Sequence, residues 1–412
     1  MTFKVGVGTA IRAAYTDNGV PYMWESGDVT TIPSNEFKIK ASDAADDDYF
    51  GNSVAVGSGR IVVGAYADDD NGAGSGSAYI YNINAGIGTT ENKKILASDG
   101  AGGDNFGWSV AVGSGRIVVG AYGDDYNGNL TGSAYIFDLN GNQLGIITAS
   151  DGTAGDYFGW SVAVGSGKIV VGAFFDDDNG NASGSAYIYD LDGTNEVKIR
   201  ASDGAASDFF GFSVAVGSGK IVVGSYGDDD NGSVSGSAYI YDLDGTNEVK
   251  ITASDNFAGD QFGRSVAVGS GRIVVGAPFD NDNGSDSGSA YIYNLDGTNE
   301  VKITASDGSA DDKFGWPVAV GSGRIVVGCS GDVNSNKGAA YIYDLDGNQL
   351  EIITASNGAS GDNFGYSVAA GSGKIVVGAR LDNIGFNNQG SAYIYDTPQV
   401  YTLYDAIDLQ YG

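Results

Sequence analysis

The sequence has no histidine and only one cysteine in 412 residues. Histidine is the commonest general base and the commonest transition-metal ligand, so its absence excludes Ser-His-Asp or Cys-His catalysis and histidine zinc sites within this chain. The single cysteine, Cys329, cannot form an internal disulfide. It occupies a position that is alanine in similar segments, at Ala65 and Ala121, so we expect a buried and unreactive thiol.

Basic residues are also scarce, because 21 Lys and Arg stand against 52 Asp and Glu and give a net charge of −31. A charge of this sign repels nucleic acid and anionic membrane surfaces, and we therefore expect no nucleic-acid partner. No stretch approaches the roughly 20 apolar residues that cross a bilayer, and residues 1–19 lack the apolar region of a signal peptide. We expect no membrane insertion and no cleaved export signal.

The most abundant feature of the sequence is repetition. The pair Phe-Gly occurs seven times in register, at spacings of 56, 52, 52, 52, 52 and 50 residues. The pairs begin at Phe50, Phe106, Phe158, Phe210, Phe262, Phe314 and Phe364. A fixed period in this range indicates stacked supersecondary units, so the fold is best predicted from one unit.

Each unit contains four short β-branched runs, typically SVAVG, KIVVGA, GSAYIY and VKIT. A Gly-Ser-Gly turn, a loop rich in Asp, Asn and Gly, and an LDGTNE turn connect them. A single four-stranded sheet cannot bury both of its faces, whereas seven sheets arranged radially cover one another. We therefore predict an all-β fold, a seven-bladed β-propeller of four-stranded antiparallel blades.

The words FG, SVA and VVGA resemble the FG-GAP repeats of integrin α-chains and of many bacterial surface proteins, over about residues 36–396. Two departures matter. The calcium loop that the resemblance implies between the first two strands is replaced by GSGK or GSGR, which is too short and too poor in oxygen ligands. The proline of GAP survives only at Pro278, so the chain is more similar to the bacterial branch, with its DDDNG segment.

The N-terminal strand is expected to close the ring. Residues 35–43, NEFKIKASD, match the NEVKITASD segment that elsewhere forms the fourth strand, so residues 36–40 can complete the last blade. Residues 400–404 are a rival closing strand. We predict residues 1–34 as an N-terminal extension for attachment, residues 35–396 as the propeller and residues 397–412 as a tail.

Strand direction sorts the loops onto two faces. We call the upper face the one that carries the DDDNG loops and the SDG connections that lead into Phe-Gly, and the lower face the one with the Gly-Ser-Gly turns. Hard cations prefer clustered carboxylates, so calcium is the one candidate cofactor, and a solvated acidic rim is the alternative explanation of the same residues. The candidate ligands are Asp68, Asp70, Asp176, Asp178, Asp228, Asp230, Asp280 and Asp282.

Aromatic residues recur near the upper ends of the strands, and the former proline position holds Tyr66, Tyr122, Phe174 and Tyr226. Packing between blades is one interpretation, and an exposed surface for sugar stacking or protein docking is the other. The loops of the last two blades lose the acidic run, and the last gains Ile384 and Phe386 beside Arg380. We expect a ligand or partner contact there, unless these loops have drifted and Phe386 packs locally.

Three functions remain open. The first is a non-enzymatic recognition module on the surface of a phage particle, in its tail or adhesion apparatus, with virion proteins or a host surface glycan or protein as partners. The second is an extracellular adhesin of a marine bacterium, secreted without a cleaved signal. The third is a propeller lyase or glycosidase, which we do not favour because the carboxylates repeat alike in most blades, whereas a catalytic pair should be singular.

Overall fold

The structure is a computed structural model. It describes residues 36–83, 88, 90–125, 128–331, 337–383 and 385–397, together with the backbone of the strands β1 (Ala13–Asp17) and β2 (Val20–Trp24). The chain divides into two compact units, residues 1–34 with 398–412 and residues 35–397. In the first unit, β1 and β2 pair as an antiparallel hairpin. None of the described residues forms a helix long and apolar enough to cross a membrane.

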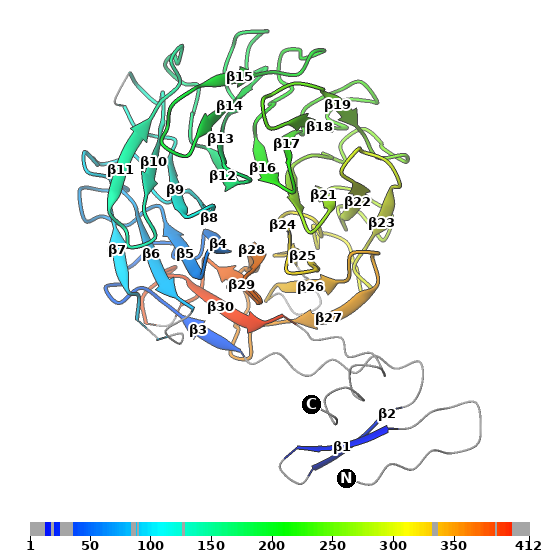
Figure 1. The fold of residues 1–412 in the computed structure, drawn as a ribbon. Coiled ribbons are helices and arrows are strands. Elements are labelled where there is room, and N and C mark those ends of the chain that lie inside the picture. Colours follow the sequence, from blue (N-terminus) through cyan, green and yellow to red (C-terminus); the bar gives the residue numbers. More distant parts are fainter. Residues whose placement is uncertain are drawn as a thin grey trace, which may run out of the picture. The chain divides into compact units, whose positions relative to one another are not determined.

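The second unit is a propeller of seven four-stranded antiparallel sheets around a central axis (Figure 1). Blades 1 to 3 are β4 (Ser53–Gly57), β5 (Arg60–Ala65), β6 (Ser77–Asn82), β7 (Lys93–Ile95); β8 (Ser109–Gly113), β9 (Arg116–Ala121), β10 (Ser133–Phe137), β11 (Gln143–Ile147); and β12 (Ser161–Gly165), β13 (Lys168–Ala173), β14 (Ser185–Asp190), β15 (Val197–Ile199). Blades 4 and 5 are β16 (Ser213–Gly217), β17 (Lys220–Ser225), β18 (Ser237–Asp242), β19 (Val249–Ile251); and β20 (Ser265–Gly269), β21 (Arg272–Ala277), β22 (Ser289–Asn294), β23 (Val301–Ile303). Blades 6 and 7 are β24 (Val318–Gly321), β25 (Arg324–Cys329), β26 (Ala339–Tyr343), β27 (Gln349–Ile353); and β28 (Phe364–Gly371), β29 (Lys374–Ala379), β30 (Ser391–Asp396), β3 (Phe37–Ile39). The predicted fold class is confirmed.

The turn between the first two strands of each blade is a two-residue hairpin loop. In blade 1, Gly57 pairs with Arg60, and the two residues between them have positive φ, 49° at Ser58 and 72° at Gly59. Two positive φ values are the signature of the type I′ turn, whose twist matches that of the flanking strands. Turns this tight leave no space for a metal-binding loop between the first two strands.

The Phe-Gly pair is the point where neighbouring blades interlock. Phe106 is fully buried between blades 1 and 2, where it packs with Ile80 and Val62 of the first and Ile117 of the second. The following Gly107 has a φ of 91°, and a Cβ there would lie 2.2 Å from the carbonyl oxygen of Ser77. Only glycine fits both the backbone conformation and this close approach, which explains why the pair recurs.

The N-terminal strand closes the ring, as predicted. Strand β3 pairs antiparallel with β30, with Phe37 opposite Ile394, and thereby supplies the fourth strand of blade 7. Further along, the amide of Tyr49 donates to the carbonyl oxygen of Asn388 at 3.1 Å. Residues 400–404, the rival closing strand, lie outside the described residues. Cys329 is fully buried, as expected from the sequence.

Candidate binding face

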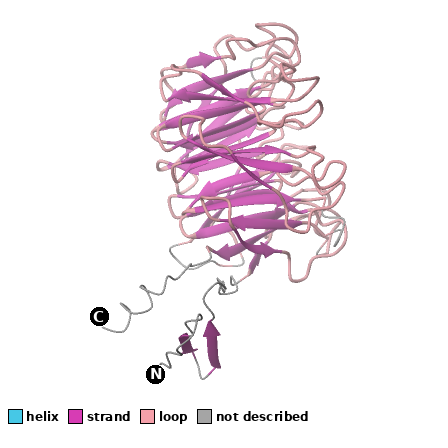
Figure 2. Cartoon of the chain, turned by 90° about the vertical axis from the view of Figure 1, so that its right-hand side faces the viewer, coloured by secondary structure: helices cyan, strands magenta, loops and turns pink. Residues whose placement is uncertain are grey.

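The long loops gather along one edge of the propeller, opposite the short hairpin turns (Figure 2). This edge is the upper face. Each upper loop between the second and third strands lies against the connection that enters the same blade from the preceding one. In blade 4, for example, the amide of Gly227 donates to the carbonyl oxygen of Asp208 at 3.1 Å. The two sets of loops that carry the carboxylates are therefore neighbours, as strand direction predicts.

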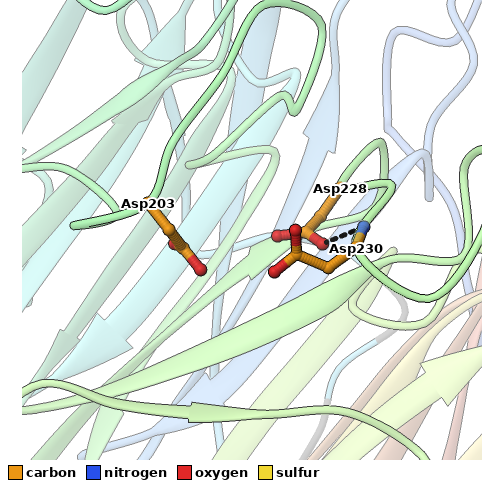
Figure 3. Close-up of side chains that lie close together, drawn as sticks. All are labelled: Asp203, Asp228 and Asp230. Atoms are coloured by element: carbon orange, nitrogen blue, oxygen red, sulfur yellow. Dashed lines mark hydrogen bonds between the residues drawn. The ribbon is translucent and has the colours of Figure 1, made fainter.

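Blade 4 shows how the carboxylates come together. Asp203 lies in the connection from blade 3, while Asp228 and Asp230 lie in the loop between β17 and β18 (Figure 3). Asp228 is only 5% exposed, and its Oδ1 accepts the amide of Asp230 at 3.2 Å. The Tyr239 hydroxyl lies 2.9 Å from an oxygen of Asp203 and 2.8 Å from one of Asp228. We call such a set of Asp side chains around a tyrosine an acidic cluster.

A lysine of the fourth strand fills each complete acidic cluster. Lys250 lies opposite Tyr239 in the β18–β19 ladder, and its Nζ is 2.7 Å from oxygens of Asp203, Asp228 and Asp230. The ammonium group also lies 5.4 Å from the centre of the Tyr239 ring. Lys94, Lys198 and Lys302 make the corresponding three ion pairs in blades 1, 3 and 5, at 2.6 to 2.8 Å. Sequence reasoning missed these lysines.

The ion pairs shift the titration of both partners. Burial by itself raises the pKa of Asp203, but hydrogen bonds from Lys250 and Tyr239 outweigh it and hold this pKa below its ordinary value. Burial lowers the pKa of Lys250, and its three carboxylate partners reverse that effect and raise it. The cluster is thus charged on both sides at neutral pH, and it is held together by electrostatic attraction.

The other three blades depart from this pattern. Isoleucine replaces the lysine in blades 2 and 6, where Ile146 and Ile352 lie opposite the cluster tyrosines. Blade 7 keeps Lys38, whose Nζ is 2.5 Å from Asp382, but has Asn357 in place of the connection aspartate. The lysine thus occurs with all three carboxylates in blades 1, 3, 4 and 5.

The structure places the eight predicted metal ligands in these clusters, two in each of blades 1, 3, 4 and 5. In blades 4 and 5, three carboxylate oxygens lie within 4.8 Å of one another, close enough to share a cation. The lysine ammonium group bonds the same oxygens, so a calcium ion would have to displace it. Calcium binding remains a prediction, and the described contacts account for the carboxylates through lysine.

A second set of aspartates is buried and forms no ion pair with the described residues. Asp208 is 5% exposed, and its Oδ2 accepts the amide of Ala205 at 2.7 Å. Burial raises the pKa of Asp208 to about 6, against the opposing effect of this hydrogen bond. Asp48 and Asp260 repeat the arrangement, and burial likewise raises the pKa of each to about 6.

The aromatic residues form what we call the aromatic collar, at the upper end of the axis. Its members lie near the start of an inner strand or directly follow the second strand of a blade. They are Tyr66, Trp108, Tyr122, Trp160, Phe174, Phe212, Tyr226, Trp316 and Tyr366. Ring contacts run from blade to blade, such as Trp108 to Trp160 at 4.6 Å and Trp160 to Phe212 at 5.6 Å. Below the collar lies a channel of about 230 Å³, lined by valines and alanines of the inner strands.

The four aromatic residues predicted as a secondary surface all belong to this collar. Tyr66, Tyr122 and Tyr226 remain partly exposed, whereas Phe174 is buried at 4% exposure. Tyr66 lies 5.0 Å from Trp108, Tyr122 lies 5.1 Å from Trp160 and Phe174 lies 5.3 Å from Phe212, and in each pair the second residue belongs to the next blade. Tyr226 lies 4.8 Å from the guanidinium carbon of Arg264 in blade 5, so the four also pack between blades. Packing and partial exposure coexist at these positions.

Two arginines interrupt the collar. Arg264 takes the place of an aromatic residue in blade 5, and its guanidinium carbon lies 4.1 Å from the Trp316 ring and 4.8 Å from the Tyr226 ring. Arg380 takes the former proline position in blade 7, with its guanidinium carbon 3.7 Å from the Tyr366 ring. Sequence reasoning found Arg380 and missed Arg264, although each is the only charged residue among the seven residues at its repeat position.

The remaining predicted contact residues lie farther out. Phe386 is 53% exposed in the upper loop of blade 7, and Ile384 lies outside the described residues. Within the described part of the chain no contact joins Phe386 to Arg380, which instead donates to Asn52 Oδ1 at 3.4 Å. The structure therefore separates the predicted site into an exposed loop and the collar.

The repeat, its register and its interlocking Phe-Gly pairs agree with a known protein family. The model of the FG-GAP repeat matches residues 33–81, 89–137, 142–189, 194–241, 246–293, 298–343 and 348–395. The chain belongs to the FG-GAP repeat family. Each matched segment ends with the third strand of a blade, so its fourth strand belongs to the next match, and this offset is what closes the ring. No curated protein matches the chain.

Proposed function

We propose that this FG-GAP protein is a non-enzymatic recognition module on the surface of a phage particle, in its tail or adhesion apparatus. Its partner in this proposal is a host receptor or a neighbouring virion protein, which it contacts through the upper face. The proposal adds a setting and a partner to the propeller fold, which by itself suits recognition without catalysis.

The observation that carries the proposal is the position of the propeller's two ends. The amide of Thr397 donates to the carbonyl oxygen of Gly373, in the lower turn between β28 and β29, at 3.0 Å. Glu36 precedes β3, whose Phe37 pairs with Ile394 near the same end of β30. The described propeller thus begins and ends on the lower side of one blade, which leaves the upper face free for a partner.

The upper face also carries apolar side chains that a solvated loop does not need. Phe386 is 53% exposed in blade 7, and Phe257 is 71% exposed in the connection between β19 and β20. Exposed aromatic residues of this kind are enriched at interfaces, because they bury a large area at a small cost in conformational entropy.

A second candidate is an extracellular adhesin of a marine bacterium. The net charge of −31 favours it, because a strongly acidic surface keeps a β-rich protein soluble at high salt. We do not propose an enzyme. The acidic clusters repeat in blades 1, 3, 4 and 5 and each contains a lysine, whereas general acid catalysis needs a carboxyl group that differs from its neighbours.

The test is to locate the chain in purified particles by mass spectrometry and antibody labelling, and to measure binding of the intact chain to host cells. Phe386→Ser is expected to weaken cell binding without lowering the melting temperature. Leu144→Ser is the matched control, because Leu144 is 54% exposed on the outer strand β11. Absence of the chain from particles, or full binding by folded Phe386→Ser, would overturn the proposal.

A further inference from the structure

Three partly buried cationic side chains on the upper face have no acidic partner within the described residues. Arg264, Lys313 and Arg380 make no ion pair there, although the chain carries 52 acidic residues. In contrast, the upper-face lysines of blades 1, 3, 4, 5 and 7 each bind aspartate, and Arg200 pairs with Asp178 at 3.1 Å. We call these three residues the cationic trio.

The cationic trio is grouped around shared aromatic rings. Arg264 and Lys313 flank Phe279, with the guanidinium carbon at 5.8 Å and Nζ at 5.6 Å from the ring centre. Tyr366 lies beneath Arg380 and also acts electrostatically on Arg264. The trio therefore spans blades 5 to 7 at one side of the collar.

Hydrogen bonds leave these groups incompletely satisfied. Among the described residues, Nε of Arg264 and Nε of Arg380 are buried and have no hydrogen-bond partner. Arg264 donates through Nη1 to Gln261 Oε1 at 2.6 Å, and burial lowers its pKa from the ordinary value. A partly buried guanidinium without an anion is costly, and an incoming carboxylate would offset that cost.

The repeat identifies these positions as departures. The slot of Arg264 holds tryptophan in blades 2, 3 and 6, and the slot of Arg380 holds tyrosine in blades 1, 2 and 4. Lys313 occupies the slot of Gln261 in blade 5. Three cations replace neutral residues within three consecutive blades, in a protein whose other upper loops are acidic.

We propose, as a refinement of the function proposed above, that the cationic trio with Trp316, Phe279 and Tyr366 binds a sugar that bears a carboxylate, such as a terminal uronic acid. The carboxylate pairs with the guanidinium groups, and the apolar face of the sugar ring stacks on the aromatic rings. The acidic clusters elsewhere on this face repel extended polyanions, so the ligand carries one charge at its end. An acidic peptide has the charge but no flat apolar ring to cover the aromatic residues.

In the experiment, the intact chain is titrated with methyl β-D-glucuronide and, separately, with the neutral methyl β-D-glucoside. Saturation-transfer NMR measures the binding of each glycoside. We expect the glucuronide to bind at least about tenfold more tightly, the factor typical of one charge-assisted hydrogen bond. Arg264→Trp, Lys313→Gln and Arg380→Tyr each insert a residue that the same slot holds in another blade, so the fold is expected to persist. Each should weaken glucuronide binding about tenfold, while Arg200→Gln, the matched control, should leave it unchanged.

Equal binding of the two glycosides, or full binding by all three folded variants, would overturn the inference. Binding of a short acidic peptide at equal affinity, with the same loss in the variants, would overturn the sugar and indicate a protein carboxylate. If the chain binds cells but the glucuronide neither binds nor competes, the proposed function stands and this inference fails. If the glucuronide binds but the chain associates with neither particles nor cells, the proposed function fails and the sugar site stands.

Discussion

Lys250 Nζ lies 2.7 Å from Asp228 Oδ2, at the centre of a cluster that has the oxygen ligands of a cation site. Asp228 is almost completely buried, and Lys250 is 21% exposed. The lysine comes from the outer strand of the blade and the aspartate from a loop nearer the axis, so their ion pair ties the edge of the sheet to the upper face. The same tie recurs in blades 1, 3 and 5.

Removing the ammonium group should therefore destabilise a blade. In Lys250→Met the three carboxylates of blade 4 lose their cation, and we expect a loss of about 2 kcal/mol, because two of the three are partly exposed and screened. Lys220→Met is the matched control in the same blade, since among the described residues Lys220 forms one ion pair, with the solvent-exposed Asp242, and its loss should cost less than that of Lys250. Chemical denaturation measures both. Equal losses would show that the cluster has no special role.

The same substitution tests calcium. In the wild-type chain the lysines compete for the carboxylates, so calcium should change the melting temperature little. In Lys250→Met the oxygens of Asp203, Asp228 and Asp230 become available, and we expect millimolar calcium to restore stability. Calorimetry with calcium and with a chelator measures this. A large chelator effect on the wild-type chain would instead support the calcium sites predicted from the sequence.

Stability should depend on pH in two opposite ways. Burial raises the folded pKa of Asp48, Asp208 and Asp260 to about 6, above the ordinary value of 3.8, so the folded state binds protons more tightly than the unfolded state. The free energy of unfolding should therefore rise as pH falls from about 7 to about 4, by about 1 to 3 kcal/mol for each group. Asp203 has a lowered pKa, so its contribution is lost below about pH 4.

Asp208→Asn isolates the first effect. Asparagine keeps the acceptor for the amide of Ala205 but does not titrate, so the variant should gain stability at pH 7 and lose part of the rise toward pH 5. Asp177→Asn, at the equivalent exposed loop position of blade 3, serves as the control. Melting curves from pH 4 to pH 8 decide the question, and identical pH profiles for the wild type and Asp208→Asn would contradict it.

The fold could be predicted because each of its causes is local. A few neighbouring residues are enough to predict the two-residue turns, the β-branched strands and the glycine of Phe-Gly. The sevenfold repeat of these local signals then predicts seven blades. The position of the lysine in each acidic cluster was harder to predict, because Lys250 and Asp203 are 47 residues apart and come into contact only when the blades pack. One signal was available in the sequence, since the lysine occurs with an aspartate at the third position of the DDD or DND run in blades 1, 3, 4 and 5 and is isoleucine in blades 2 and 6.

The collar shows the opposite limit. The sequence predicts aromatic residues at the strand ends, but residue type alone does not distinguish a packed ring from an exposed one. Phe174 is buried, whereas Tyr66 is partly exposed. Arg264 was not predicted, because a repeat pattern points to the residues that recur from blade to blade. A residue that interrupts a repeat can carry more functional information than the residues that maintain it.

Closure of the ring predicts the result of truncation. Deleting residues 1–40 removes β3, which exposes the outer edge of β30 along Ala392 to Ile394 and removes the ion pair of Lys38 with Asp382. An exposed β edge favours aggregation, and a loss of several kcal/mol is expected because the last blade also holds the first through Tyr49 and Asn388. Deleting residues 1–34 is the matched control, since it keeps β3 and should melt like the parent.

Deleting residues 398–412 tests the rival strand at 400–404. Because closure is complete with β3, this C-terminal deletion should leave the melting temperature unchanged, and a collapse of the C-terminal variant together with a stable variant lacking residues 1–40 would reverse the assignment.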